Sequence, residues 1–288
     1  MEEQEYKIEN VKSFELKDIF DCGQCFRWNK QKDGSYTGIF KENVMNVKKE
    51  GNIITFKGIC KGNIKKVVEN YFDLNRDYEK IKEQLSKVDE NVRTSIEYGQ
   101  GLRILNQDLW EMIISYIISA NNNIPRIKGI IDRLSKNYGK EIEWNGEKYY
   151  TFPTPEELEN VTIEDYKKLG AGFRDVRLYE TVHMVLDKKI DLEKMHNNPN
   201  TLEVREQLLT LSGVGPKVAD CILLFSTLKR FEVFPIDVWV RRVMNELYIK
   251  NENEEKVNKK ELEKLAQKKF GNLAGIAQQY LFYWKREA

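Results

Sequence analysis

The chain has 288 residues, a length that allows about two domains, each with a buried core. Lysine and arginine number 47 against 46 aspartate and glutamate residues, and the net charge of +1 excludes a uniformly basic protein, so any contact with a polyanion must be local. The longest apolar stretch, residues 112–118, is too short to cross a membrane, and the acidic residues 1–5 lack the basic start of an export signal. We therefore expect a cytoplasmic protein.

Residues 6–62 carry the pattern of an antiparallel sheet. Residues typical of strands alternate or cluster in residues 36–40, 44–48 and 53–56, and hairpin turns are predicted at Asp33-Gly34 and at residues 50–52. Helical periodicity begins near Asn63, and the glycines in residues 99–101 mark a joint. We predict an α+β fold, with an N-terminal antiparallel sheet domain that includes helices in residues 1–100 and an all-α domain in residues 101–288.

The four cysteines are too few and too scattered for a secreted disulfide framework, and they favour a reducing cytoplasm: Cys22, Cys25, Cys60 and Cys221. Cys22 and Cys25 have the spacing of a redox motif, but an extended pattern follows them rather than a helix. His183 and His196 have no partners at the spacing of metal ligands. We expect neither thiol chemistry nor a metal site.

Helical signals dominate the second domain. Asp108 is placed to cap the apolar helix that follows it, and the three asparagines of residues 121–123 end that helix. Thr154 is predicted to open another helix, and the glycines in residues 169–172 end the next one.

Residues 211–221, Leu-Ser-Gly-Val-Gly-Pro-Lys-Val-Ala-Asp-Cys, predict a helix end, a glycine turn and a new helix. Gly213 and Gly215 permit a turn with positive φ, and Pro216 suits the first helical position. The free N–H groups at the start of such a helix bind phosphate. Lys217 lies in the first turn, where the helix dipole is expected to lower its pKa and make it a nucleophile.

Asp237 follows a proline in the loop after this second helix, so the chain can bring its carboxylate near the amine of Lys217. A lysine and a carboxylate beside a phosphate cradle predict attack on a sugar carbon in DNA. The alternative is a non-catalytic hairpin that grips the DNA backbone, in which Lys217 contacts phosphate and Asp237 is a helix cap.

This combination resembles the helix-hairpin-helix superfamily of DNA base-excision glycosylases, whose hairpin and glycine- and proline-rich loop ending in aspartate match here. Four further segments look like those of the 8-oxoguanine DNA glycosylases, so that the resemblance covers nearly the whole chain: residues 23–28, 119–126, 169–174 and 277–282. The C-terminal match is the loosest of the four.

The resemblance implies a bifunctional glycosylase and AP lyase that removes 8-oxoguanine opposite cytosine. Lys217 would attack C1′ and form a Schiff base that permits β-elimination, while Asp237 would stabilise the cationic sugar and help to position or deprotonate the amine. No cofactor is expected, and the four-cysteine iron–sulfur cluster of some relatives cannot form because only Cys221 lies in the second half. A monofunctional glycosylase for alkylated bases would not need Lys217.

The same resemblance implies a pocket for the flipped base. The Gly23 carbonyl would detect the extra hydrogen on N7 of 8-oxoguanine, and Gln278 would read the Watson–Crick edge. Cys221 and Phe282 would stack on the two faces of the base. The alternative assigns Cys221 and Phe282 to the hydrophobic core.

For the DNA around the flipped nucleotide, the resemblance places Asn121 in the vacated space and Phe173 as a wedge between bases. Arg126 and Arg174 would bind the orphaned cytosine through its O2 and N3 acceptors. The alternative is that the two arginines are ordinary surface ion-pair partners.

The hairpin glycines Gly213 and Gly215 would hold the DNA backbone. Trp239 departs from the pattern, because eukaryotic members carry a histidine there close to a phosphate, and an indole donates one N–H and stacks but carries no charge. The expected partner is double-stranded DNA containing 8-oxoguanine. We expect a monomer without membrane contact, associated with the nucleoid if the source is bacterial.

Overall fold

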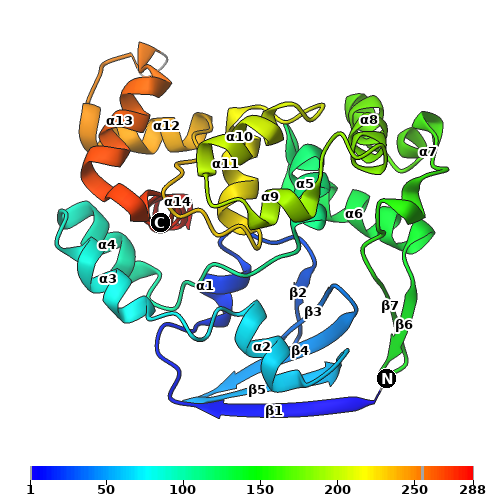
Figure 1. Cartoon of the computed structure of the whole chain (residues 1–288). Helices are drawn as coiled ribbons and strands as arrows, with labels where there is room; N and C mark the ends of the chain where they lie inside the picture. The colour runs from blue at the N-terminus through cyan, green and yellow to red at the C-terminus, as the bar shows by residue number, and fades with distance from the viewer. Residues whose placement is uncertain (1, 254–255, 288) are drawn as a thin grey trace.

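The computed structural model describes residues 2–253 and 256–287, and Figure 1 shows a sheet with most of the helices gathered on one side of it. The sheet has five strands in the order β1-β5-β4-β3-β2, and every neighbouring pair is antiparallel. Its strands are β1 (Glu3–Glu9), β2 (Trp28–Lys30), β3 (Tyr36–Phe40), β4 (Asn43–Glu50) and β5 (Ile53–Ile59). The predicted strands and both predicted turns are confirmed, since Gly34 and Gly51 take positive φ.

An aromatic cluster packs the sheet against two helices, α1 (Leu16–Phe20) and α2 (Ile64–Tyr71). The Phe20 ring stacks 4.3 Å from that of Trp28 and meets Phe72 edge-on at 6.1 Å. Gly38 on β3 leaves room for the indole, because a Cβ there would lie 2.4 Å from Trp28. Asn63 caps α2 by accepting from the Lys66 N–H, which confirms a helix starting near Asn63. α1 lies inside residues 6–62, where the sequence predicted extended structure.

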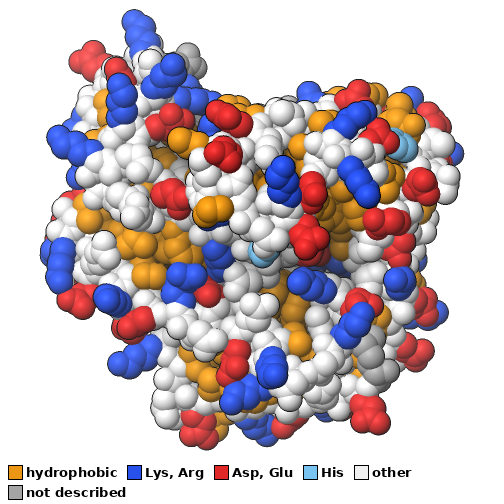
Figure 2. Space-filling view, in the orientation of Figure 1, with side chains coloured by type: hydrophobic (Ala, Val, Ile, Leu, Met, Phe, Trp, Pro, Cys, Tyr) orange, Lys and Arg blue, Asp and Glu red, His pale blue; other side chains and the backbone are white. Residues whose placement is uncertain are grey.

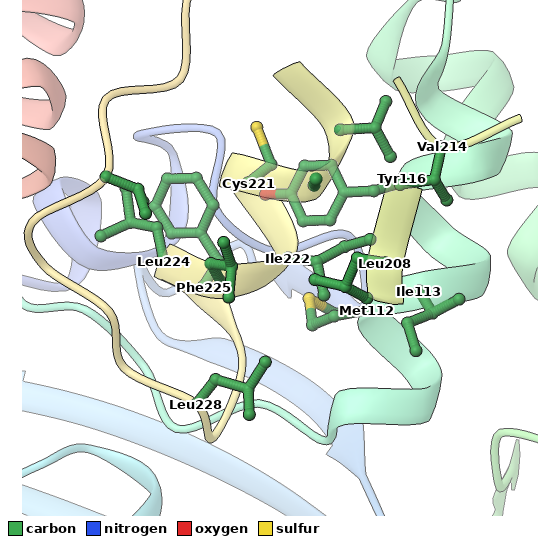
Figure 3. Packing of buried hydrophobic residues seen from close by; sticks show 14 of the residues in the cluster. Met112, Ile113, Tyr116, Leu208, Val214, Cys221, Ile222, Leu224, Phe225 and Leu228 are labelled. Atoms are coloured by element: carbon green, nitrogen blue, oxygen red, sulfur yellow. The ribbon is translucent and has the colours of Figure 1, made fainter. Parts of the chain in front are cut away.

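The remaining helices form the larger part of the molecule. Its helices are α3 (Tyr78–Ser86), α4 (Glu90–Tyr98), α5 (Leu109–Ser119), α6 (Ile124–Tyr138), α7 (Ile163–Lys168), α8 (Asp175–Leu186), α9 (Leu192–Asn197), α10 (Thr201–Leu209), α11 (Pro216–Phe225), α12 (Val238–Met244), α13 (Lys259–Phe270) and α14 (Ala274–Glu287), with short turns η1 (Glu156–Leu158), η2 (Gly172–Arg174), η3 (Asn245–Ile249) and η5 (Gly271–Leu273). Asp108 caps α5 as predicted. Figure 3 shows α5 and α11 packing through Met112, Tyr116 and Ile222.

The prediction of an all-helical second domain is wrong for residues 141–150. These residues form a hairpin of β6 (Glu141–Trp144) and β7 (Glu147–Tyr150), turned by Asn145 and Gly146, both with positive φ. Asn-Gly between alternating residues is a strong hairpin signal that was available in the sequence. Trp144 explains why the hairpin is stable, because it packs against Ile39 and Val44 of the large sheet. Thr154 opens only the short turn η1 rather than a full helix.

Residues from before and after residue 100 share the hydrophobic core of the helical part. Leu85, Val92 and Ile96 on α3 and α4 belong to the hydrophobic core of the helical part, and α4 packs against α14 (Figure 1). Gln24, which precedes β2 of the sheet, bonds to the segment before α5. Its side chain donates to the Arg103 carbonyl at 2.7 Å and accepts from the Leu105 N–H at 2.9 Å. The division into residues 1–100 and 101–288 therefore remains a prediction.

Charged side chains are dispersed on the face of the molecule in Figure 2, where lysine and arginine alternate with aspartate and glutamate. Among the described residues, no helix combines the length and the apolar character needed to cross a membrane.

A buried ion pair links the sheet domain to α5. Glu111 in the first turn of α5 is 7% exposed, and its Oε2 lies 3.8 Å from Nη1 of Arg27. Arg27 also donates to the Tyr150 carbonyl of the hairpin. Burial raises the pKa of Glu111 from 4.5 to about 7, although Arg27 opposes the shift.

This shift predicts how stability depends on pH. A carboxyl whose pKa is raised in the folded state stabilises the protein fully below its unfolded pKa, and this contribution is lost as pH rises toward 7. Glu111→Gln has no such titration and should not lose this stability. The free energy of unfolding of the wild type should therefore fall by about 3 kcal/mol relative to that of the variant between pH 4.5 and 7. Urea unfolding at several pH values measures it, with the exposed Glu159→Gln as control. Parallel pH curves for wild type and Glu111→Gln would contradict the assignment.

Candidate functional site

The predicted hairpin connects α10 to α11. Gly213 has φ of +83°, a conformation that side chains rarely adopt, and Pro216 is the first residue of α11. The prediction that Gly215 also takes positive φ is wrong. Its φ of −88° and ψ of 177° are extended, a conformation that any residue can adopt. The first-turn N–H groups of α11 lack partners within the helix, so the hairpin presents donors to an anion.

Lys217 lies half-buried in the first turn of α11, and its amine is hydrogen-bonded to Cys221 one turn later. Its Nζ lies 5.8 Å from the centre of the Tyr116 ring. The pKa of Lys217 is raised, first by the Cys221 sulfur and then by the Asp237 carboxylate, which together outweigh burial. The prediction of a lowered pKa is therefore wrong, because the interactions of the amine with Cys221 on the same helix and with Asp237, which the tertiary fold brings to it, outweigh burial and the helix dipole.

Burial raises the pKa of the Cys221 thiol to about 11, so this thiol is protonated near neutral pH. Asp237 is then the negative group that keeps Lys217 charged. Its Oδ1 caps α12 by accepting from the Val240 N–H at 2.8 Å, so the carboxylate is held at a helix N-terminus while it faces the amine. Asp237 is thus both a cap and a neighbour of Lys217.

Tyr116 is a site residue that the sequence did not reveal. Its ring lies 5.7 Å from Phe26 and 6.0 Å from Phe225, and Figure 3 shows its hydroxyl directed toward Cys221. The hydroxyl is buried and has no hydrogen-bond partner among the described residues. The apolar pattern of α5 gave no signal, since a helix buried on all sides looks the same with or without a functional tyrosine.

The structure brings Gly23 and Phe282 together, because a Cβ on Gly23 would lie 3.7 Å from the Phe282 ring. Gln278 lies one turn earlier on α14, is 5% exposed, and its Oε1 has no partner among the described residues. Buried polar atoms are normally hydrogen-bonded, so this unpaired oxygen is an acceptor that a ligand could use. α14 packs on α11 where a Cβ on Gly275 would lie 2.7 Å from Leu224. Cys221 belongs to the core cluster as well as to the Lys217 contact.

Hydrogen bonds fix the loop around Gly23. The carbonyls of three of its residues accept from side chains: Asp21 from Arg286, Cys22 from Gln279 at 2.7 Å, and Gln24 from Gln107 at 2.8 Å. Within the described residues, no donor reaches the Gly23 carbonyl. Gly23 itself has φ of +88°. One carbonyl of this loop is therefore left available to a ligand.

The four residues expected around the flipped nucleotide gather between α5, α6 and α8. Asn121 has φ of +51° and is exposed, and Phe173 is 54% exposed. Arg174 is only 2% exposed, and its guanidinium donates to the carbonyls of Ala120, Asn121 and Ala171. Arg126 is exposed, and its Nη2 lies 3.4 Å from the Gly170 carbonyl. Among the ion pairs formed within residues 2–253 and 256–287, none includes Arg126 or Arg174, and both guanidinium groups contact backbone carbonyls instead.

Trp239 stands on α12 two residues after Asp237 and is 39% exposed. It lines a surface cavity of about 590 Å³ together with Arg242, Lys250, Lys285 and Glu246, and the Glu246 carboxylate lies 2.6 Å from the Lys285 amine. The cavity therefore combines an aromatic face with three cationic side chains and one carboxylate.

All four cysteines are free and buried. Burial raises the pKa of Cys22 to about 11 and that of Cys25 well above its usual value, which disfavours the reactive thiolates. In the described part of the chain, no group of three or more histidine, cysteine, aspartate or glutamate side chains is arranged to hold a metal ion.

Comparisons with known proteins agree with this geometry. Residues 7–113 match the family model of the 8-oxoguanine DNA glycosylase N-terminal domain, and residues 114–269 match that of the HhH-GPD superfamily of base excision DNA repair proteins. A probable N-glycosylase/DNA lyase of Methanothermobacter thermautotrophicus is 32% identical over 245 residues, 78% of this chain and 76% of the relative.

Solved structures extend the likeness over the whole chain. The 8-oxoguanine glycosylase/lyase of Clostridium acetobutylicum in its apo form is 44% identical, with a TM-score of 0.91 and 98% coverage of both chains. The same enzyme in complex with DNA containing cytosine opposite 8-oxoguanine gives a TM-score of 0.93 at 44% identity and covers 99% of this chain and 97% of that one. The hairpin with Lys217, the sheet domain with Gly23 and these likenesses agree, and the chain belongs to the 8-oxoguanine DNA glycosylase/lyase family of the HhH-GPD superfamily.

Proposed function

We propose that this protein removes 8-oxoguanine paired with cytosine from double-stranded DNA and then cleaves the strand at the abasic site. The observation that carries the proposal is the half-buried Lys217 at the start of α11, held between Cys221 and Asp237 directly behind a hairpin that can bind phosphate. An amine in that position reaches a sugar carbon only if the nucleotide leaves the stack, which costs a few kcal/mol.

The chemistry begins with a proton. Lys217 is an ammonium in the free protein because its pKa is raised, and an ammonium has no lone pair for attack. Asp237 is the carboxylate placed to take that proton and to stabilise positive charge on the sugar as the bond from C1′ to the base breaks. The base departs with the electrons of that bond, and the amine nitrogen bonds to C1′. Ring opening then gives a Schiff base, and loss of a C2′ proton expels the 3′ phosphate.

Recognition of the lesion rests on acceptors that are unsatisfied in the free protein. The Gly23 carbonyl can accept from N7–H of 8-oxoguanine, whereas N7 of guanine is itself an acceptor and would leave both groups unpaired. An unpaired buried group costs about 1–3 kcal/mol. Gln278 would pair its free Oε1 with the Watson–Crick edge, and Cys221 and Phe282 would enclose the base.

The remaining candidate residues would contact the DNA around the flipped nucleotide and the base opposite it. Asn121 would fill the vacated space and Phe173 would separate the bases. Arg174 holds the backbone at Ala120 and Asn121 in the free protein, so it would have to exchange these contacts to bind cytosine. Arg126 carries the larger share of opposite-base reading in our proposal, because its guanidinium is exposed.

Arg126→Met should therefore narrow the preference for cytosine over adenine by about tenfold, chiefly by improving the relative rate on the adenine pair. Cytosine offers O2 and N3 as neighbouring acceptors, whereas adenine presents an N6 donor and leaves guanidinium donors unpaired. Single-turnover excision from duplexes with each of the four opposite bases measures this. Arg126→Lys keeps the positive charge but lacks the two neighbouring N–H donors of a guanidinium, so it distinguishes an effect of charge from an effect of paired hydrogen bonds. An unchanged ratio in Arg126→Met would assign the selectivity elsewhere.

We further propose that Gly213 and the extended Gly215 let the hairpin approach the DNA backbone, and that Trp239 stacks at the DNA surface beside the cavity lined by Arg242 and Lys250. The protein would act as a monomer without a cofactor, in the cytoplasm and at the nucleoid in a bacterium.

Borohydride reduction during turnover tests the function. A duplex with 8-oxoguanine opposite cytosine should become covalently linked to the protein, and an undamaged duplex should not. Base release without a cross-link would instead indicate a monofunctional glycosylase. Binding with neither would indicate a non-catalytic hairpin protein.

A further inference from the structure

Two side chains of α14 donate hydrogen bonds to the loop that carries Gly23. Gln279 is 2% exposed and donates to the Cys22 carbonyl at 2.7 Å, and Arg286 donates to the Asp21 carbonyl. These carbonyls belong to the two residues immediately before Gly23. The orientation of the Gly23 peptide thus depends on a helix more than 250 residues further along the chain, since 257 residues separate Gln279 from Cys22.

Arg286 also contacts the other wall of the pocket. Its guanidinium carbon lies 5.2 Å from the centre of the Phe282 ring, within the range of a cation–π contact. An ideal Cβ on Gly23 would lie only 2.9 Å from its Nη1, so the guanidinium fills the space beside this glycine. One side chain therefore bridges the loop and the aromatic ring that we propose to enclose the lesion.

We infer that Arg286, supported by Gln279, is a positioning residue for lesion recognition, which holds the Gly23 carbonyl at a fixed place relative to Phe282. This inference rests on the proposed function, since it assigns a role to the pocket for 8-oxoguanine. A carbonyl reads a single N–H only if its direction is fixed, because hydrogen bonds weaken steeply as they bend. Because the carbonyls of Asp21, Cys22 and Gln24 are held on both sides of it, the Gly23 peptide is fixed while its own carbonyl stays without a donor among the described residues.

Arg286→Met tests this role. Methionine keeps the apolar contact with Phe282 but has no donor for the Asp21 carbonyl. Arg286 lies near the end of α14 and is partly exposed, so the fold should tolerate the change. Single-turnover excision of 8-oxoguanine opposite cytosine should fall by about tenfold to a hundredfold, as expected for loss of a hydrogen bond from a charged donor.

An abasic duplex provides the readout that distinguishes positioning from folding. Cleavage at an abasic site uses Lys217 but offers no base to the pocket, so its rate in Arg286→Met should stay close to that of wild type. Arg286→Lys, which restores one charged donor, should recover part of the excision rate. Arg93→Met removes an exposed arginine on α4 and should change neither rate.

Equal losses on both substrates would overturn the positioning role, as would an unchanged excision rate in Arg286→Met. Wild-type protein that cleaves abasic DNA but releases no 8-oxoguanine would contradict the proposed function itself. The two failures are therefore distinguishable.

Discussion

Replacing Lys217 with glutamine is expected to abolish both borohydride cross-linking and release of 8-oxoguanine, while binding to the damaged duplex persists. Glutamine has a similar length and can still meet Cys221, but its amide nitrogen has no available lone pair for attack on C1′. The rate should fall by several orders of magnitude, on the scale of removing a nucleophile. Single-turnover excision and a binding titration with the same duplex measure the two properties.

Lys264→Gln provides the matched control, since it removes a lysine charge from an exposed position on α13. It should leave both cross-linking and excision unchanged. Base release by Lys217→Gln at a rate near that of wild type would show that lysine attack is wrong and would favour an activated water molecule.

Asp237→Asn is expected to slow excision by about 10²-fold or more, because it removes a preorganised negative charge from beside the cationic sugar. Asparagine caps helices as well as aspartate does, so the contact with the Val240 N–H should survive and α12 should remain folded. Affinity for the damaged duplex should change little. A large loss of affinity with an unchanged chemical step would reverse the assignment.

The pH dependence gives a second readout of Asp237. Its carboxylate raises the pKa of Lys217, so the pKa of Lys217 should fall in the asparagine variant. The limb of the pH–rate profile that reports deprotonation of the amine should therefore move to lower pH, while the maximum rate falls. If the limb stays in place, Asp237 does not act on the Lys217 proton.

Several elements could be predicted because their signals are local. The strands of the N-terminal sheet alternate along the chain, and Asn63, Asp108 and Asn123 cap the helices that they precede. The hairpin of residues 141–150 was predictable from its Asn-Gly turn and was nevertheless missed. Its strands are only four residues each, and Trp144 packs them on a sheet about 100 residues earlier in the chain, a contact that only the tertiary structure shows.

The sequence by itself determined the reaction centre, because a glycine turn, a first-turn lysine and an aspartate that caps the next helix are all specified by short segments. Only the tertiary structure decided the charge of Lys217, since the carboxylate of Asp237, which the fold brings to the amine, raises its pKa against the helix dipole that the sequence suggested. Only the tertiary structure also placed Tyr116 next to Lys217 and brought the side chains of Arg286 and Gln279 into hydrogen bonds with the loop around Gly23. Electrostatic fields and hydrogen-bond partners depend on distances in space, and the residues that supply them here lie on helices far from Gly23 in the chain.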